Sequence, residues 1–313
     1  MHDEVSELYR RYRRNAQPSR RGKIVFHGVE GRDVYNPTVP FLNNGGWCIA
    51  ARVEVRDCER SQVCFFAWDG GEQATLLPDA PVFVLQDPFI GRIDGQLLFG
   101  GVEVSFSADG TPLRWRTQFF YGATIATLRP LATGPWGMKD IRLVSLYDGR
   151  ILVFTRPQGE IGGRGTIGWT IISRLDELNA QTIARAALIS HVDERCWCGV
   201  NAAYLLPSGN VGVLAHVAQF DHAGNRHYYA ARFIFDPLSG TSSPMAIIAS
   251  RDDFLPGESK SDDLQDVVFP AGLLEDGKGN VRLFCGTSDC EVQWWDIAPP
   301  FAQDRKRTPP TDA

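Results

Sequence analysis

The sequence predicts an all-β fold, a single-domain five-bladed β-propeller, and the first reason is a pattern that occurs five times. In each copy a polar residue opens an apolar run, a glycine-containing turn interrupts the run, and a second apolar run follows. The second reason is the spacing of the openings, which are 51, 53, 61 and 65 residues apart, at Asn36, Asp87, Asp140, Asn201 and Asp266. A blade of four short strands needs about 40 to 50 residues, and loops account for the surplus.

Turn chemistry is the third reason for this fold. Asp94-Gly95 and Asp148-Gly149 interrupt two of the repeats, and such dipeptides accept the positive φ of a hairpin corner. Strand-forming residues flank them, as in the segment 151–154. We therefore expect one domain over residues 23–300, with blade cores near residues 36–68, 87–128, 139–174, 201–236 and 266–297.

Three segments differ from the repeats. Residues 1–22 form a basic extension with helical periodicity, which predicts an amphipathic helix packed outside a blade. Residues 175–188 also have a weak helical pattern. Residues 301–313 are polar and contain proline, so we expect a disordered tail.

Composition limits the partners and the compartment. No stretch is long and apolar enough to span a bilayer, and the N-terminus lacks an apolar signal core, which predicts no membrane partner. Seven cysteines without paired CxxC motifs suit a reducing cytoplasm, and we expect Cys196 and Cys198 to be buried thiols, with no metal site. The net charge of −5 argues against nucleic acid as a partner.

The repeats also predict where a site lies. The innermost strand of each blade lines the central channel, so polar residues at one repeat position converge. The openings supply Asn36 with nearby Asp33, Asp87, Lys139 with Asp140, Asn201, and Asp266. Positions 15 or 16 residues later supply Arg52, Arg156 and His216. Carboxylates and cations together predict a pocket for an anionic ligand or a sugar phosphate.

An ordered series of short motifs at these positions resembles a known family. The series runs NP at 36, ARVE at 51, DP at 87, KD at 139, RP at 156, HV at 216, FPAGLL at 269 and SD at 288. Over roughly residues 27 to 297 the chain resembles glycoside hydrolase family 130, which contains five-bladed β-mannoside phosphorylases and some hydrolases. It resembles still more a group of β-1,2-mannosyltransferase-phosphorylases that build and degrade the mannan reserve mannogen.

The resemblance implies roles for individual residues. Asp87 matches the catalytic acid, although Gln86 replaces the glutamate that precedes it in the family, and Thr155 replaces a histidine before Arg156. The implied phosphate-binding or anion-binding residues are Arg52, Lys139, Arg156, His216, Tyr228 and Tyr229, where only one of the two tyrosines need face the site. The implied sugar-binding residues are Asn36, Asp33, Asp140, Asp266 and Asp289.

The implied reaction is inverting phosphorolysis of β-1,2-mannosides to mannose 1-phosphate, or the reverse mannosyl transfer from GDP-mannose. The expected ligands are β-mannooligosaccharide, inorganic phosphate, mannose 1-phosphate and GDP-mannose, with phosphate or GDP-mannose as co-substrate and no other cofactor. Phosphate brings its own nucleophilic oxygen, so one acid is enough.

Two other functions stay open from the residues alone. An inverting hydrolase needs a second carboxylate roughly 6.5 to 9.5 Å from the acid, and Glu54, Glu103 and Asp289 are candidates for it. A propeller can also be a binding platform without catalysis.

Two further features bear on the pocket. Trp136, in a turn just before Lys139, is the aromatic residue expected nearest to it. The glycine-rich segment 159–169 lacks the GK[ST] of a phosphate-binding loop and is interpreted as a mobile loop over the pocket.

Overall fold

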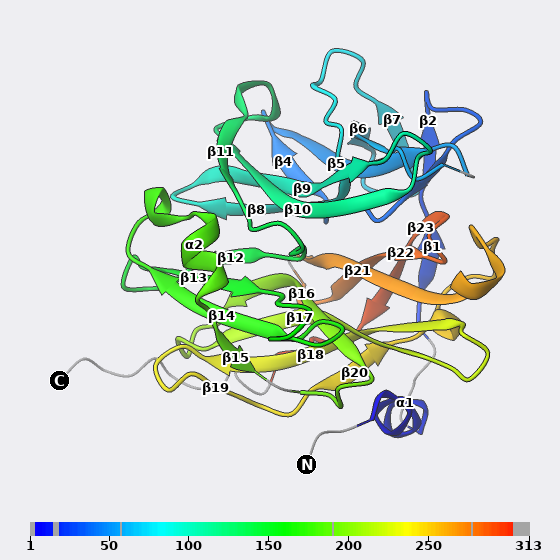
Figure 1. The fold of residues 1–313 in the computed structure, drawn as a ribbon. Coiled ribbons are helices and arrows are strands. Elements are labelled where there is room, and N and C mark those ends of the chain that lie inside the picture. Colours follow the sequence, from blue (N-terminus) through cyan, green and yellow to red (C-terminus); the bar gives the residue numbers. More distant parts are fainter. Residues whose placement is uncertain (1–3, 15–18, 57, 190, 277, 303–313) are drawn as a thin grey trace.

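The computed structural model describes residues 4–14, 19–56, 58–189, 191–276 and 278–302. Within these residues most of the chain is β-structure, which confirms the all-β prediction (Figure 1). Strand pairing follows the five predicted repeats in order. The count of five blades stays a prediction, because pairing joins the last two repeats into one nine-stranded sheet.

The first two repeats form two sheets. In the first, β5 (Gly46–Glu54), β6 (Gln62–Trp68) and β7 (Gln73–Leu76) are antiparallel, β3 (Asp33–Tyr35) and β4 (Phe41–Asn43) pair with β5, and β2 (Val25–His27) runs parallel to β7. The second contains, in order, β8 (Gln86–Ile93), β9 (Gln96–Phe106), β10 (Pro112–Gly122) and β11 (Arg129–Thr133).

The third repeat contains β12 (Arg142–Ser145), β13 (Ile151–Thr155), β14 (Ile167–Ile172) and β15 (Ala187–Ile189). The fourth contains β16 (Trp197–Leu205), β17 (Val211–Phe220) and β18 (Arg226–Asp236), with β19 (Thr241–Ser242) and β20 (Ala246–Ala249) on the free edge of β18. The fifth contains β21 (Asp266–Glu275), β22 (Val281–Thr287) and β23 (Glu291–Ile297). A two-residue parallel pairing between β18 and β21 links these last two repeats.

The chain closes on itself at its two ends. Strand β1 (Arg21–Lys23), from the N-terminal side, pairs with β23 and crosses the predicted domain boundary at residue 23. Neighbouring repeats contact one another in sequence order, because β8 contacts β5 and β12, β16 contacts β12 and β21, and β23 contacts β3. The starts of successive repeats therefore lie around a common centre.

Hairpin geometry agrees with the turn residues. Asp94 and Gly95 both have positive φ, at 51° and 76°, as a two-residue type I′ turn requires. At the second predicted corner only Gly149 has positive φ, at 82°. These turns lie at the strand ends opposite to the repeat openings.

The helices are short. α1 (Val5–Arg13) buries Val5 and Leu8 against the fourth repeat, and Tyr9 stacks on Tyr229 with ring centroids 4.7 Å apart, which confirms the predicted outer helix. In the predicted segment 175–188 only α2 (Ala180–Ala184) is α-helical. Single 3₁₀ turns cover Ile125–Thr127, Leu175–Glu177, Arg251–Asp253 and Asp262–Leu264. No helix in the described ranges is both long and apolar enough to cross a bilayer. Most of the predicted tail, residues 303–313, lies outside the described residues.

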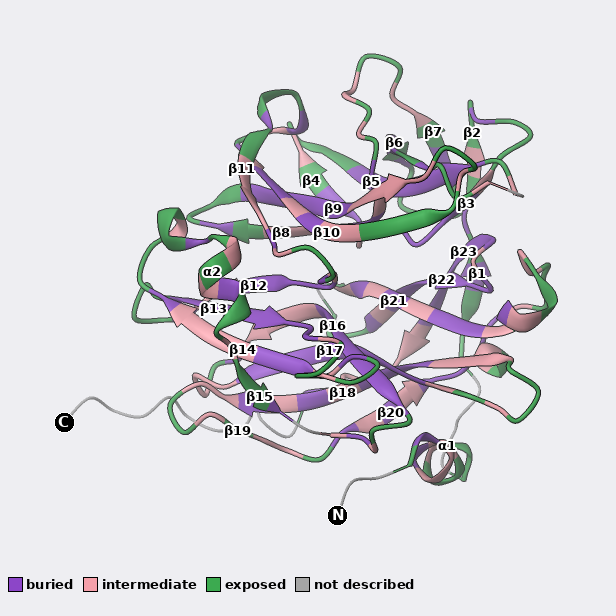
Figure 2. Ribbon diagram, in the orientation of Figure 1, coloured by how far each residue is buried: buried purple, intermediate pink, exposed green. Residues whose placement is uncertain are grey.

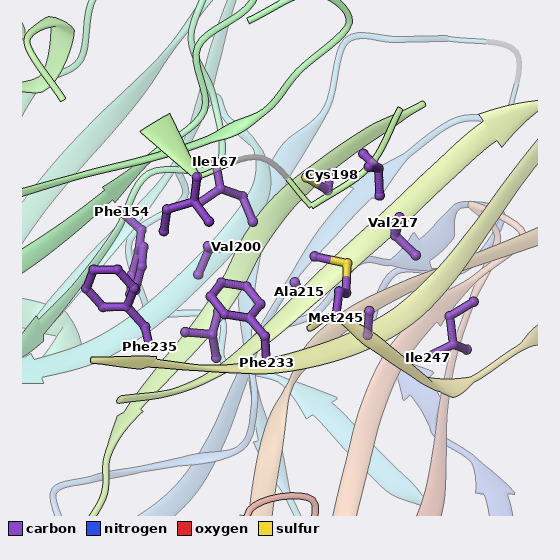
Figure 3. Packing of buried hydrophobic residues seen from close by; sticks show 14 of the residues in the cluster. Phe154, Ile167, Cys198, Val200, Ala215, Val217, Phe233, Phe235, Met245 and Ile247 are labelled. Carbon is purple, nitrogen blue, oxygen red and sulfur yellow. The ribbon is translucent and has the colours of Figure 1, made fainter. Parts of the chain in front are cut away.

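Buried residues concentrate along the strands (Figure 2), and a hydrophobic cluster joins the third and fourth repeats. Between the third and fourth repeats, Phe154 packs edge-on against Phe233 and Phe235, at centroid distances of 6.5 and 5.4 Å (Figure 3). Cys196 and Cys198 belong to this cluster as free, buried thiols, as predicted. Because His216 lies on β17 and Arg156 directly follows β13, two strands that this core holds together, their positions are fixed by apolar packing.

Candidate active site

Three of the residues that open repeats have a left-handed backbone. The φ angle is 43° at Asn36, 46° at Asp87 and 59° at Asp140, and all three side chains are buried. Asn and Asp tolerate this region better than other non-glycine residues. Such strain costs about 1–3 kcal/mol per residue and clusters at functional sites. Backbone geometry therefore explains why Asn or Asp recurs at these openings.

Asp87 lies between three polar partners. Its Oδ1 accepts hydrogen bonds from Asn36 Nδ2 at 2.9 Å and Arg52 Nη1 at 3.2 Å, and its Oδ2 is 3.8 Å from Lys139 Nζ. Burial alone raises the pKa of Asp87, but the charges of Arg52 and Lys139 outweigh burial and lower this pKa to about 2. We call Asn36, Arg52 and Asp87 the Asp87 cluster. In the free protein Asp87 is a carboxylate.

Arg52 ties the Asp87 cluster to a second buried carboxylate. Its Nη2 is 2.9 Å from Glu54 Oε2, and Glu54 is 2% exposed. Glu54 also accepts hydrogen bonds from Tyr35, Ser61 and Lys260. This carboxylate is fully occupied by protein donors, so it is poorly placed to activate a water molecule as a hydrolase base.

A second group lies around Arg156, and we call Asp140, Arg156, Asn201 and His216 the Arg156 cluster. Arg156 Nη1 is 3.4 Å from Asp140 Oδ2, and Arg156 Nε donates to the Cys198 carbonyl at 2.9 Å. Burial raises the pKa of Asp140, but Lys139 and Arg156 outweigh it and lower this pKa. Among the described residues, no hydrogen-bond partner reaches Arg156 Nη1, Asn201 Nδ2 or either carboxylate oxygen of Asp140, although all are buried.

His216 lies at the edge of this cluster. Its Nδ1 is 2.8 Å from Asn201 Oδ1, and its Nε2 is 4.0 Å from Asp140 Oδ2. Burial, opposed by the charge of Asp140, lowers the pKa of His216 to about 3, so the imidazole is neutral. In the tautomer with a proton on Nδ1, Nε2 is left as an acceptor.

Lys139 joins the two clusters. It is next to Asp140 in sequence, and its ammonium approaches Asp87. Burial disfavours its charge, but Asp140 and Asp87 outweigh burial and raise the pKa of Lys139. Its side chain is 35% exposed, so this cation is accessible from outside.

Two glycines leave room for the Arg156 side chain. A Cβ at Gly165 would lie 2.7 Å from Arg156 Nη2, and a Cβ at Gly199 would lie 2.7 Å from Arg156 Cδ. Gly165 belongs to the predicted glycine-rich loop, in which Gly159 and Gly163 pair with each other. This loop therefore packs directly on the Arg156 cluster.

Asp289 belongs to the Asp87 side of the site. It follows β22 in a left-handed turn with φ of 49°, and its charge acts on Arg52, Asp87 and Lys260. Burial, together with the charge of Asp87, raises the pKa of Asp289. Of the three candidates for the general base of a hydrolase, Asp289 is the one that remains.

Other predicted site residues lie elsewhere. Asp33 forms a two-bond ion pair with Arg56, and Glu103 pairs with Arg116 on β10. Trp136 has Arg114 and Arg116 over its ring, at 4.1 and 4.3 Å, rather than a contact with either cluster.

The two tyrosines point to different surroundings. Tyr228 lies beside His216, with ring centroids 5.7 Å apart. Tyr229 instead donates to Asp266 Oδ2 at 2.8 Å, on the side of the sheet that α1 covers. Asp266 is also 2.6 Å from His227 Nδ1, so Asp266 and Tyr229 lie outside both clusters.

Three residues of the site were not predicted. Tyr35 lies under the Arg52 guanidinium at 4.9 Å, and Lys260 reaches Glu54 from the loop before β21. Arg142 is buried over the Phe89 ring, donates to the Asn201 carbonyl at 2.7 Å, and burial lowers its pKa to about 10. The one available signal is that Lys260 is the single cation in the acidic segment 252–266.

Comparison with known proteins places this geometry in a family. A family model described as protein of unknown function (DUF1861) matches residues 11–303. Among curated proteins no sequence matches the chain.

Solved structures are similar over nearly the whole chain. The mannose phosphorylase MPT-4 from Leishmania mexicana, solved in complex with phosphate ion, is 34% identical with a TM-score of 0.90, over 96% of this chain and 94% of that one. MPT-1, a GDP-Man-dependent mannosyltransferase from the same organism, is 31% identical with a TM-score of 0.87, over 96% of each chain. A β-1,2-mannobiose phosphorylase from Listeria innocua, in complex with β-1,2-mannobiose, shares the fold at 13% identity and a TM-score of 0.61, over 88% of this chain and 93% of that one. The chain therefore belongs to the DUF1861 family, is related to these mannose phosphorylases and mannosyltransferases, and is a carbohydrate-active enzyme.

Proposed function

We propose that this enzyme is a five-bladed propeller that moves mannosyl units between β-1,2-mannosides and phosphate with inversion. The observation that carries the proposal is the Arg156 cluster, where the buried donors Arg156 Nη1 and Asn201 Nδ2 have no hydrogen-bond partner among the described residues and lie near Lys139. Donors of this kind suit an anion. The similarity to a mannose phosphorylase solved with phosphate supports the same assignment.

In phosphorolysis, Asp87 donates a proton to the departing glycosidic oxygen, directly or through a sugar hydroxyl, as the bond to the anomeric carbon breaks. A phosphate oxygen attacks that carbon from the opposite face, and the product is mannose 1-phosphate. Lys139 and Arg156 hold the phosphate, the neutral His216 accepts a hydrogen bond at Nε2 from a protonated phosphate oxygen, and Tyr228 lies beside them. Asn36, Asp140 and Asp289 are the proposed sugar contacts. No metal or other cofactor takes part.

Mannosyl transfer from GDP-mannose uses the same site in the direction of synthesis, with GDP as the leaving group in place of the inorganic phosphate that mannose 1-phosphate would release. The attacking sugar hydroxyl gives its proton to Asp87, and GDP leaves. The low pKa of Asp87 suits this direction, because the carboxylate is already present to accept the proton. In the phosphorolytic direction, a bound phosphate dianion offsets the positive potential of Lys139 and raises the pKa of Asp87.

A groove next to Asp87 offers space for the rest of the saccharide. It has a volume of about 680 Å³ and lies between the first two sheets, with Glu54, Glu59 and Gln86 in its wall. Inversion requires the incoming and leaving groups on opposite faces of the sugar. We place the saccharide chain in this groove and the phosphate at the Arg156 cluster.

A hydrolase is the second candidate, because Asp289 lies on the Asp87 side with a carboxyl that no cation neutralises at hydrogen-bond distance within the described residues. Incubation with β-1,2-mannooligosaccharides, with and without inorganic phosphate, separates the two. Mannose 1-phosphate formed only with phosphate is the expected result. Free mannose in both tubes would establish the hydrolase. The absence of any product would exclude both candidate functions.

A further inference from the structure

An exposed aromatic residue with two guanidinium groups over its ring lies at the end of β17. Phe220, the last residue of this strand, is 38% exposed. The guanidinium carbons of Arg164 and Arg226 are 5.2 and 5.8 Å from its ring centroid, and the Trp197 ring is 4.8 Å away. We call Phe220, Arg164, Arg226 and Trp197 the Phe220 platform.

Direct contacts connect the platform to the proposed anion site. Trp197 Nε1 donates to the Tyr228 hydroxyl at 2.7 Å, and the Tyr228 ring lies beside His216. His216 and Phe220 are four residues apart on one strand, so they share a face and are separated by roughly 13 Å. The platform therefore lies beyond the proposed phosphate-binding residues, toward the C-terminal end of β17.

The two arginines of the platform differ in charge balance. Arg226 is paired with Asp263. Arg164 is exposed and forms no ion pair within the described part of the chain. It lies next to Gly165, which packs on the Arg156 guanidinium, so the loop that carries this cation is anchored at the anion site.

We propose that the Phe220 platform binds the nucleoside part of a sugar-nucleotide donor, an inference that rests on the proposed function. Aromatic side chains stack on any nucleobase, because every base has a π-face. Arginine pairs with the O6 and N7 edge of guanine or with a phosphate. With the sugar at Asp87 and the nearer phosphate at the Arg156 cluster, the base of a nucleoside diphosphate reaches the end of β17. Inorganic phosphate does not extend that far.

The test compares two ligands of the same anion site. GDP and inorganic phosphate are titrated into the full chain by calorimetry, and the KM values for GDP-mannose in transfer and for phosphate in phosphorolysis are measured. For Phe220→Ala we expect GDP affinity to fall and the KM for GDP-mannose to rise about tenfold, which corresponds to about 1.4 kcal/mol. Phosphate binding and its KM should change less than twofold. Trp47→Ala is the matched control, because Trp47 is also 38% exposed but lies at the opposite end of the strands, and neither ligand should respond.

Arg164 gives an independent check that does not depend on the Phe220 variant. Arg164→Ala should weaken GDP binding at least fivefold, and Arg164→Lys should recover part of the loss if charge contributes. Equal losses for GDP and phosphate in the Phe220 variant would overturn the platform. A second result would also overturn the platform, namely wild-type protein that releases mannose 1-phosphate but binds GDP no more tightly than phosphate. The proposed phosphorolysis would then stand, without a nucleoside site. Failure of the proposed function would give a different result from failure of the platform, because no mannose 1-phosphate would form even when phosphate is present.

Discussion

The two polar clusters of the site differ in how completely the protein satisfies them. In the Asp87 cluster, Arg52 bonds Asp87, Glu54 and Ser61 at once, and Asp87 has a partner on each oxygen. Of this cluster's buried side-chain atoms, Asn36 Oδ1 alone lacks a hydrogen-bond partner among the described residues. In the Arg156 cluster, buried atoms of Arg156, Asn201 and Asp140 have no hydrogen-bond partner among the described residues. An unsatisfied buried polar group costs about 1–3 kcal/mol. The first cluster is thus largely organised before a ligand arrives. In the second, an anion can supply the missing bonds of the donors Arg156 Nη1 and Asn201 Nδ2, and a sugar hydroxyl those of the Asp140 carboxylate.

The backbone explains the difference. Arg52 lies inside the nine-residue strand β5, and its close partners are Glu54 on the same strand, Ser61 just before β6 and Asp87 on β8. Arg156 comes just after β13, with glycines on two sides that supply no side-chain partner. The acid and the anion site are therefore built by different parts of the fold, so Asp87 and Arg156 can be altered separately.

The largest expected effect comes from the proton-transfer residue of the organised cluster. Asp87→Asn should lower kcat for phosphate-dependent mannose 1-phosphate release by about 10²- to 10⁴-fold, because general acid catalysis contributes that much. Asn keeps the shape of the side chain and tolerates a left-handed backbone. Asp94→Asn is the control, since Asp94 has the same backbone conformation at the exposed hairpin end of β8. Unchanged turnover in Asp87→Asn would remove Asp87 from the mechanism.

A substitution in the Arg156 cluster should change the KM for phosphate rather than kcat. Arg156→Lys keeps the charge beside Asp140 but loses the planar fork, so we expect the KM for phosphate to rise about 10- to 100-fold with a smaller change in kcat. Steady-state kinetics with varied phosphate measures this split. A drop in kcat alone would contradict the assignment of Arg156 to phosphate binding.

His216 should make stability depend on pH. Its pKa is about 3 in the folded protein and about 6.5 in an unfolded chain, so the unfolded state binds the extra proton between these values. The free energy of unfolding should therefore fall as pH is lowered from 6.5 to 5, by up to about 1.4 kcal/mol per pH unit from this group. Urea unfolding at both pH values should show a smaller fall for His216→Gln. The exposed His222→Gln is the control, and identical slopes in all three proteins would contradict this prediction.

The smallest effect is expected outside both clusters. Tyr229→Phe removes the hydrogen bond to Asp266 and should cost about 1 kcal/mol of stability, with kcat/KM for phosphorolysis changed less than twofold. Tyr228→Phe should raise the KM for phosphate more than twofold. The two variants differ by one position on β18, and the reverse ranking would place Tyr229 at the site.

Periodicity and residue type determined much of this protein from the sequence alone. The repeat predicted the order of the strands and singled out Asn36, Asp87 and Asp140 as residues that open successive repeats. The reason is that strand patterns and the left-handed tolerance of Asn and Asp are local properties. The same repeat position also located Arg52, Arg156 and His216.

Only the tertiary structure decided which side chains meet. Asp266 occupies a repeat opening, yet it pairs with His227 and Tyr229, because β21 packs parallel to β18 there. Lys260 reaches Glu54 across 206 positions of sequence, and no local pattern encodes such a contact. The sequence determines each strand and turn locally, but long-range packing of the closed ring decides which polar groups are satisfied and which remain for a ligand.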